Sequence, residues 1–263
     1  MNKVVSTKID QQTAWFERNM QKITRRLDAR IASLIRDLDS SGGHLLNTEE
    51  NIQMWAQIYG SILEELRASG YTELVSRLNE KENDLLRTMK KSIVPGAVPL
   101  AFTQTSQSAI SAFNSLWNAR IGNLGNDVAR QIHAIIGDSI FGGTNITDLV
   151  KSIKSILDKQ LVRYATTYVN TSRAKFIQMM QYEAARNYDG GLFWIYEGPE
   201  DDVTRPVCRE GTGMDVNAMF PNAPYFTEEE RIEFESYSAP ERTYNCRHTF
   251  MQITKEYYYD HVR

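Results

Sequence analysis

The stretch IDQQTAWFERNMQKITRRLDARIASLIRDL, residues 9–38, carries the clearest structural signal in this chain. Its apolar residues recur at spacings of three and four, which places them on one side of an α-helix. They are Trp15, Phe16, Met20, Ile23, Leu27, Ile31, Leu34 and Leu38. A stripe of this kind is buried against neighbouring helices, so the segment predicts a long helix inside a helical body.

Further helices are predicted on the C-terminal side of this stretch. DSSGGH (39–44) ends the first helix with two glycines, and Asn47 with Glu50 three residues later predicts a capping box for the second. SGY (69–71) then separates the second helix from a third, which we expect at about 72–93.

The joint PGAVP (95–99), bracketed by prolines, is a candidate boundary in the chain. Beyond it the helical periodicity returns, and we expect helices at 106–136, 148–157 and 162–188. Three glycines in GDSIFGGTNIT (137–147) predict an interruption, after which Asn145 or Thr147 caps the next helix.

The character of the chain changes after Gly191. LFWIYEG (192–198) combines aromatic and β-branched residues between glycines, which predicts a β-strand. Five of the seven prolines lie in this last part of the chain, which indicates a turn-rich structure. We therefore predict a mainly α protein with long helices in the N-terminal two-thirds and a small C-terminal α+β module. Its regions are 1–94, a helical region; 95–190, a central helical region; and 191–263, the module.

Composition and charge exclude several classes of protein. The net charge of −3 does not indicate a basic nucleic-acid-binding protein. Residues 197–241 contain twelve acidic residues against three arginines, so the remaining residues sum to +6, a charge too scattered to indicate a groove-reading domain. Neither a signal peptide nor an apolar run of about 18 residues is present, so we expect synthesis in a cytoplasm and no membrane segment.

Both cysteines lie in the least helical stretches, GPEDDVTRPVCREG (198–211) and NCRHTF (245–250). If the second stretch is extended, Cys246 and His248 share one face of the strand. A thiolate and an imidazole on one face suit zinc, and Cys208 would supply a third ligand. Asp201 and His261 are the candidates for a fourth ligand, since the CxxC pairing of zinc ribbons is absent.

Three structural roles for the two cysteines stay open at this point. A disulfide between Cys208 and Cys246 would close a loop of about 40 residues and contribute roughly 4 kcal/mol. A structural zinc ion would contribute on the order of 10 kcal/mol to folding and would be the cofactor. Simple packing of both cysteines and a hydrogen-bonded His248 is the third role, and none of the three is catalytic.

The first stretch also allows a turn and a catalytic interpretation. Pro206 forces an extended conformation on Arg205, which could then pair with Asp201 across the turn. Alternatively, Asp201, Arg205 and His248 could form a phosphodiester or nucleotide site. No glycine-rich phosphate loop, HExxH or GxSxG motif accompanies these residues, so an enzyme is the less favoured interpretation.

The same residues resemble the hallmark motifs of phage minor head proteins, the head-morphogenesis family related to the F protein of phage Mu. The first motif, G-P-x-D-x-x-T-R-P-x-C, is matched by Gly198, Pro199, Asp201, Thr204, Arg205, Pro206 and Cys208. The second, N-C-R-[CH], is matched by Asn245, Cys246, Arg247 and His248. Upstream residues consistent with the family's order are Thr171, Arg173, Ala174, Ala185, Gly190 and Trp194.

The resemblance covers about residues 130–255, and SAPERTYNCRH (238–248) departs from the family because it lacks a glycine before the second motif. What it implies is a virion protein, made in the host cytoplasm, that acts in head assembly or genome ejection. The implied partners are the portal, other virion proteins, further copies of the chain and packaged DNA. The alternative is a nuclease or nucleotide-modifying effector carried in the particle.

Overall fold

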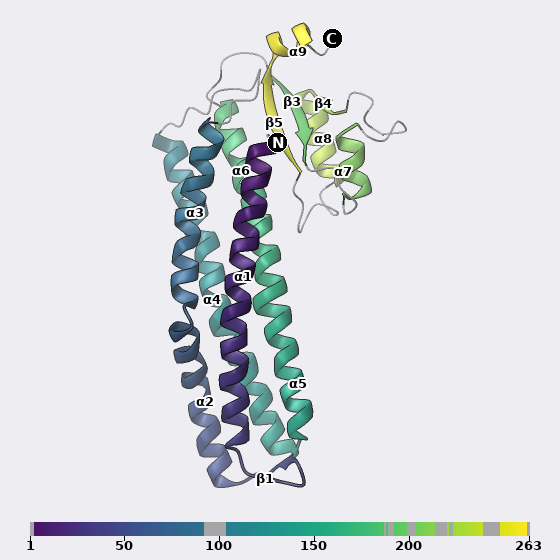
Figure 1. The fold of residues 1–263 in the computed structure, drawn as a ribbon. Coiled ribbons are helices and arrows are strands. Elements are labelled where there is room, and N and C mark those ends of the chain that lie inside the picture. Colours follow the sequence, from purple (N-terminus) through teal and green to yellow (C-terminus); the bar gives the residue numbers. More distant parts are fainter. Residues whose placement is uncertain are drawn as a thin grey trace. The chain divides into compact units, whose positions relative to one another are not determined.

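The computed structural model describes residues 3–91, 104–186, 188, 192–198, 204–213, 220, 223–238 and 248–261. Long helices make up the N-terminal part and a small α+β module the C-terminal part, which confirms the predicted fold class (Figure 1). The chain forms two compact units. We call Ala14–Glu80 with Leu116–Thr166 the helical unit, and Met1–Thr13, Lys81–Ser115 and Thr167–Arg263 the sheet unit.

These units combine segments from distant parts of the chain. The division into 1–94, 95–190 and 191–263 describes the order along the sequence, and it stays a prediction. The joint predicted at 95–99 lies outside the described residues.

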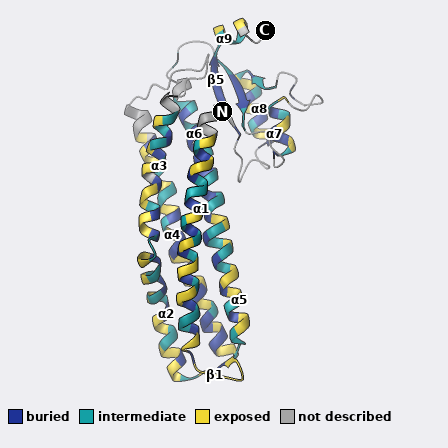
Figure 2. Ribbon diagram, in the orientation of Figure 1, coloured by how far each residue is buried: buried dark blue, intermediate teal, exposed yellow. Residues whose placement is uncertain are grey.

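Helix α1 (Lys3–Arg36) confirms the predicted amphipathic helix. In the helical unit its buried side is the apolar stripe, and Figure 2 shows buried positions in dark blue alternating with exposed positions in yellow along α1. The buried residues are Phe16, Met20, Ile23, Leu27, Ile31 and Ile35. Trp15 and Leu34 are only half-buried, since they lie at the edges of the stripe.

A short hairpin connects α1 to α2. Strands β1 (Ser40–Ser41) and β2 (His44–Leu45) pair antiparallel across Gly42 and Gly43, which have positive φ angles of 57° and 81°. A side chain would be strained at both turn positions, which accounts for the two glycines there.

Helix α2 (Glu49–Ala68) begins one residue later than predicted. Its N-cap is Thr48 and not Asn47: the Thr48 hydroxyl accepts from the backbone N–H of Asn51 at 3.2 Å. Buried Asn51, in the first turn of α2, donates through its side-chain amide to the carbonyls of Asp39 and Leu46, and its Oδ1 accepts from the Asp39 N–H. Asn51 therefore ties the hairpin to the first turn of α2.

Helix α3 (Tyr71–Lys91) follows the predicted break, where Gly70 has a φ of 94°. Helix α4 (Gln104–Gly142) runs through the predicted interruption. The prediction of a helix end at 136 is wrong, because Gly137 serves packing and not chain reversal. A Cβ there would lie 2.7–2.9 Å from the indole of Trp55, whose Nε1 donates to the His133 carbonyl at 2.8 Å.

Helices α5 (Ile146–Ile156) and α6 (Ala165–Arg186) were predicted as separate, but a π-helix, η1 (Leu157–Tyr164), joins them without a break. The predicted cap Asn145 is confirmed, since its side chain accepts from the Thr147 N–H at 2.9 Å. None of the helices in the described part of the chain is long and apolar enough to cross a membrane.

The module is built on a three-stranded antiparallel sheet of order β4-β3-β5. Strand β3 (Leu192–Glu197) confirms the predicted strand and lies in the centre, between β4 (Tyr225–Phe226) and β5 (Thr249–Thr254). Three short helices complete it: α7 (Pro206–Gly211), α8 (Glu228–Ser238) and α9 (Lys255–His261).

Candidate functional site

The pairing of β3 with β5 brings the two sequence motifs together. Glu197 pairs with Thr249, so Gly198 of the first motif follows one strand at the point where His248 of the second motif precedes the other. A Cβ on Gly198 would overlap ring carbons of His248 and lie only 2.8 Å from its Cα. Only glycine fits this close approach, and that is a physical reason for the first residue of the motif.

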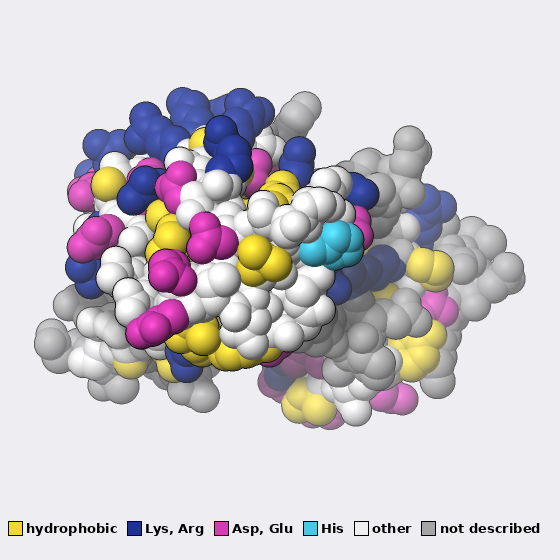
Figure 3. Space-filling model, turned by 90° about the horizontal axis from the view of Figure 1, so that it is seen from below, with side chains coloured by type: hydrophobic (Ala, Val, Ile, Leu, Met, Phe, Trp, Pro, Cys, Tyr) yellow, Lys and Arg dark blue, Asp and Glu magenta, His cyan; other side chains and the backbone are white. Residues whose placement is uncertain are grey.

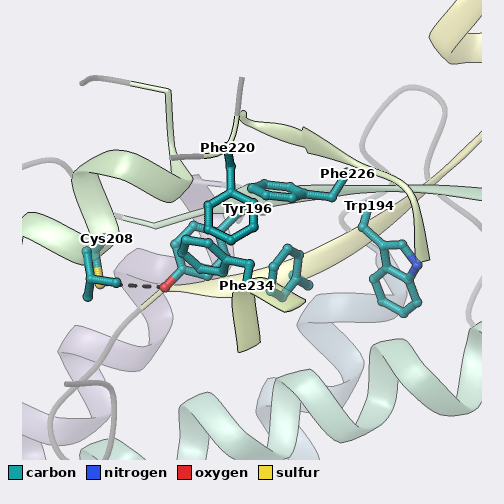
Figure 4. Packing of buried hydrophobic residues seen from close by; sticks show 8 residues of the cluster. Trp194, Tyr196, Cys208, Phe220, Phe226 and Phe234 are labelled. Carbon is teal, nitrogen blue, oxygen red and sulfur yellow. Dashed lines mark hydrogen bonds between the residues drawn. The ribbon is translucent and has the colours of Figure 1, made fainter. Parts of the chain in front are cut away.

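Tyr196 connects Cys208 to His248. Its ring stacks on the imidazole of His248, with centroids 5.6 Å apart and an angle of 21° between the planes. Its hydroxyl lies 3.5 Å from the sulfur of Cys208, as the dashed line in Figure 4 shows. All three side chains are buried, so the two motifs share one packed interior.

Helix α7 presents the remaining described residues of the first motif. Arg205 is its N-cap with an extended backbone (φ −69°, ψ 152°), as Pro206 predicted, and Pro206 occupies the first turn. Cys208 then faces inward. The helix ends on Gly211, where a Cβ would lie 2.5 Å from both the Phe234 and the Tyr196 rings.

An aromatic core surrounds these residues (Figure 4). Its buried members are Trp194, Tyr196, Val207, Cys208, Phe220, Phe226, Phe234 and Phe250. Rings meet edge-to-face or tilted, for example Tyr196 with Phe234 at 4.9 Å and with Phe250 at 4.8 Å. Such pairs add about 0.5–1.5 kcal/mol each beyond area burial, so the core supplies much of what holds this small module together.

The zinc and disulfide hypotheses both require Cys246. Cys246 lies outside the described residues, as do Pro199, Asp201, Asn245 and Arg247. Among the residues that are described, no group of three or more His, Cys, Asp or Glu could hold a metal ion. Both hypotheses, and packing alone, stay predictions.

The catalytic hypothesis required Asp201, Arg205 and His248 to meet. Asp201 is outside the described residues, Arg205 is half-buried and His248 is buried against Tyr196. The imidazole of His248 is buried, stacked on Tyr196 and close to the Gly198 backbone. These surroundings are typical of a side chain that packs in a protein core. The described geometry therefore supports a structural role for the motif residues.

A polar cluster beside the aromatic core was not predicted from the sequence. The guanidinium of Arg231 on α8 donates to Glu228 at 2.5 Å, to Glu235 at 2.5 Å and to the Tyr182 hydroxyl on α6 at 2.9 Å. It also lies over the rings of Tyr182 and Trp194, 4.9 and 4.7 Å from their centroids. The spacing of Glu228, Arg231 and Glu235 on α8 was the available signal.

Electrostatics reinforce this cluster. Burial raises the pKa of Tyr182, and its hydrogen bond to Glu235 raises it further. Burial alone would lower the pKa of Arg231, but the hydrogen bond to Glu228 and the charge of Glu235 raise it on balance. The arginine is therefore a fixed cation that joins α8 to α6 and to β3.

A second polar cluster joins three helices of the sheet unit. Arg173 on α6, one of the upstream residues of the resemblance, is buried and donates to the Gln12 side chain on α1 at 2.9 Å. Gln12 in turn donates to the Lys81 carbonyl on α3 at 2.8 Å. Burial lowers the pKa of Arg173 and the nearby carboxylate of Glu82 partly offsets this effect, which leaves the pKa at about 10.

Comparisons with protein-family models, with curated proteins and with solved structures found no match for this chain.

Proposed function

We propose that this chain is a structural protein of a phage particle, a minor head or portal-associated protein that acts in head assembly, genome ejection or both. In this proposal the protein acts through assembly and is not an enzyme. The paired motifs at 198–208 and 245–248 are the basis of the proposal, through their resemblance to phage minor head proteins.

One observation carries the proposal: Gly198 and His248, fifty positions apart, pack in contact where β3 and β5 pair. Their contact, with Cys208 joined to the same cluster through Tyr196, supports the motifs as one folded element.

The helical unit supports a role in assembly. Leu116 and Phe141 on α4 are large apolar side chains that are 69% and 56% exposed. The two residues lie 25 positions apart on α4 and form no common patch, so each is a separate candidate contact for a neighbouring subunit such as a portal or head protein.

A complementation experiment tests the proposal. A phage deleted for this gene would be supplied with the wild-type chain, with Gly198→Ala or with Gly122→Ala, and the yield of infectious particles would be counted. Gly122 is the matched control, because nothing lies within 4 Å of a Cβ at that position. We expect the wild type and Gly122→Ala to restore particles and Gly198→Ala to fail.

Normal particle yield without the gene would overturn the proposal. So would a nuclease activity of the purified protein that His248→Ala abolishes while circular dichroism shows the fold retained, since that result would favour a virion-carried enzyme.

A further inference from the structure

The solvent side of α1 in the helical unit is almost entirely basic. Between residues 14 and 36 the exposed positions are Arg18, Lys22, Arg25, Arg26, Ala29, Arg30 and Arg36. We call the six cations the basic face of α1. The two acidic residues of this stretch, Glu17 and Asp28, are half-buried at its edges.

Spacing makes the basic face a line. Its members follow one another at intervals of one to six residues, mostly three or four, so they lie on one side of the helix. From Arg18 to Arg36 the line is about 27 Å long, at 1.5 Å per residue. Figure 3, seen from below, shows Lys and Arg side chains gathered along one edge of the view.

The cations of the basic face differ in their pairing from three other cations of the helical unit. Arg130, Lys151 and Arg163 each form an ion pair with a nearby aspartate. Within the described residues, none of the six cations of the basic face pairs with a carboxylate. Neighbouring positive charges without carboxylate partners repel one another. The surface therefore has a positive potential, and binding of an anion would reduce this repulsion.

A groove flanks the basic face on the side of α3. Lys22 and Arg26 line it together with Arg77 of α3, and it also contains Gly70 and Glu73 at the start of α3. Its volume is about 240 Å³, enough for several water molecules or a phosphate group. Three cations against one carboxylate leave this groove positive.

The other side of α1 carries a second groove of about 250 Å³, shared with α5 and η1. Arg25 and Lys154 line it with Asp28 and Asp158, so its charges balance. The positive field is therefore concentrated on α1 and on the α3 side.

The chemistry of this face favours a polyanion over a protein partner. Protein interfaces are built around buried aromatic and aliphatic anchors, with charges at the rim. The exposed positions of α1 between residues 14 and 36 offer no large apolar side chain, and Ala29 is the only apolar one. An anionic membrane fits less well too, because the apolar side of α1 is buried in the helical unit and cannot insert into lipid.

We propose that the basic face of α1 binds the phosphate backbone of duplex DNA, without reading its sequence. The inference rests on the proposed function, since it takes the packaged genome as the polyanion. Duplex DNA carries about one negative charge per 1.7 Å, so a segment as long as the basic face presents roughly 16 phosphates. Arginines and lysines contact such phosphates directly.

Binding of the full-length protein to a fluorescein-labelled 30-base-pair duplex would be measured by anisotropy at several salt concentrations. Six phosphate contacts predict a slope of log K against log salt of about −5. In Lys22→Gln/Arg26→Gln/Arg30→Gln we expect a slope weaker by about 3 and an affinity at least about tenfold lower at 0.1 M salt.

Two variants control for charge and for folding. Arg67→Gln/Arg120→Gln/Arg130→Gln removes the same charge from exposed positions off the basic face and should bind within about twofold of the wild type. Lys22→Arg/Arg26→Lys/Arg30→Lys keeps the charges and should bind like the wild type.

An equal loss in both glutamine variants would overturn the inference, as would unchanged binding in the first of them. Binding to phosphatidylserine vesicles but not to the duplex would overturn it in favour of a membrane surface. Failure of the proposed function is distinguishable, because duplex binding that depends on the basic face would persist in a protein that never enters a particle.

Discussion

At Gly198 the backbone leaves β3 so close to the ring of His248 that no side chain fits between them. His248 is in turn stacked on Tyr196, which reaches Cys208. Four residues from three segments of sequence thus depend on one another's shape. Close packing of this kind tolerates little change in volume.

We therefore expect Gly198→Ala to destabilise the module by about 1–3 kcal/mol, the usual range for overpacking. Hydrogen exchange of peptides covering 192–198 and 248–254 measures this locally, as faster exchange. Gly122→Ala lies within α4 at a position where nothing is within 4 Å of an added Cβ. It should leave the exchange of these peptides unchanged. Equal exchange in wild type and Gly198→Ala would contradict the close approach.

Arg231 is the second residue whose surroundings fix its role. Its side chain is only 10% exposed, and its removal would leave Glu235 and the Tyr182 hydroxyl without their cation. We expect Arg231→Ala to lower the free energy of unfolding by about 2–3 kcal/mol in urea denaturation.

The matched control is Arg130→Ala. It breaks another arginine–carboxylate pair three residues apart, but one that is 66% and 52% exposed. Exposed pairs are worth little, so the change should stay within about 0.5 kcal/mol. If both variants lost equal stability, burial would not explain the contribution of the Arg231 cluster to the free energy of unfolding.

Some of these residue roles were readable from the sequence. Pro206 dictates the extended conformation of Arg205, but the close approach of Gly198 to His248 was not predicted. Tyr196 as the link between Cys208 and His248 was not readable, because it depends on strand pairing across about fifty residues of chain.

At the scale of the elements, the burial pattern explains why η1 is a π-helix. Leu149, Ile153, Leu157, Leu161 and Ala165 are buried at a constant spacing of four. In a regular α-helix each step of four advances 40° beyond a full turn, so four steps would carry Ala165 about 160° away from Leu149. The wider turns of a π-helix cancel this drift and keep all five residues on one side.

Deleting exposed Lys159 would change the buried spacing from four, four, four, four to four, four, three, four, which a regular α-helix satisfies. We expect this deletion variant to fold with unchanged helix content and a melting temperature within a few degrees of the wild type. Circular dichroism measures both quantities.

The control is deletion of exposed Ala29 in α1, where the buried spacing already averages near 3.6. That deletion rotates the rest of α1 by about 100° and should be strongly destabilising. If both deletions were equally harmful, the spacing of four would not explain η1.

Helix positions were largely predictable because periodicity is local, but their ends were not. Gly137 indicated a break, yet it lies inside α4 because Trp55 needs the space. That η1 joins the helices predicted at 148–157 and 162–188 was missed, because the constant spacing of four between their buried residues played no part in the prediction. The basic face of α1 was not predicted. Its charges are scattered along the sequence, and they can be assigned to one side of the helix only when the buried side is known.

At the scale of the whole molecule, the chain has an acidic surface on α8 and a basic surface on α1. The exposed side of α8 carries Glu228, Glu229 and Glu233, which would be repelled by DNA. The basic face of α1 would attract it. In the proposed protein, α1 would therefore contact DNA and the acidic side of α8 would not.

The most direct measurement is quantitative mass spectrometry of purified phage particles produced by cells that carry this gene. We expect peptides of this chain in DNA-filled particles, at a few copies relative to the major head protein, and protected from protease as long as the particles are intact. Peptides present in the cell lysate but absent from purified particles would contradict this expectation.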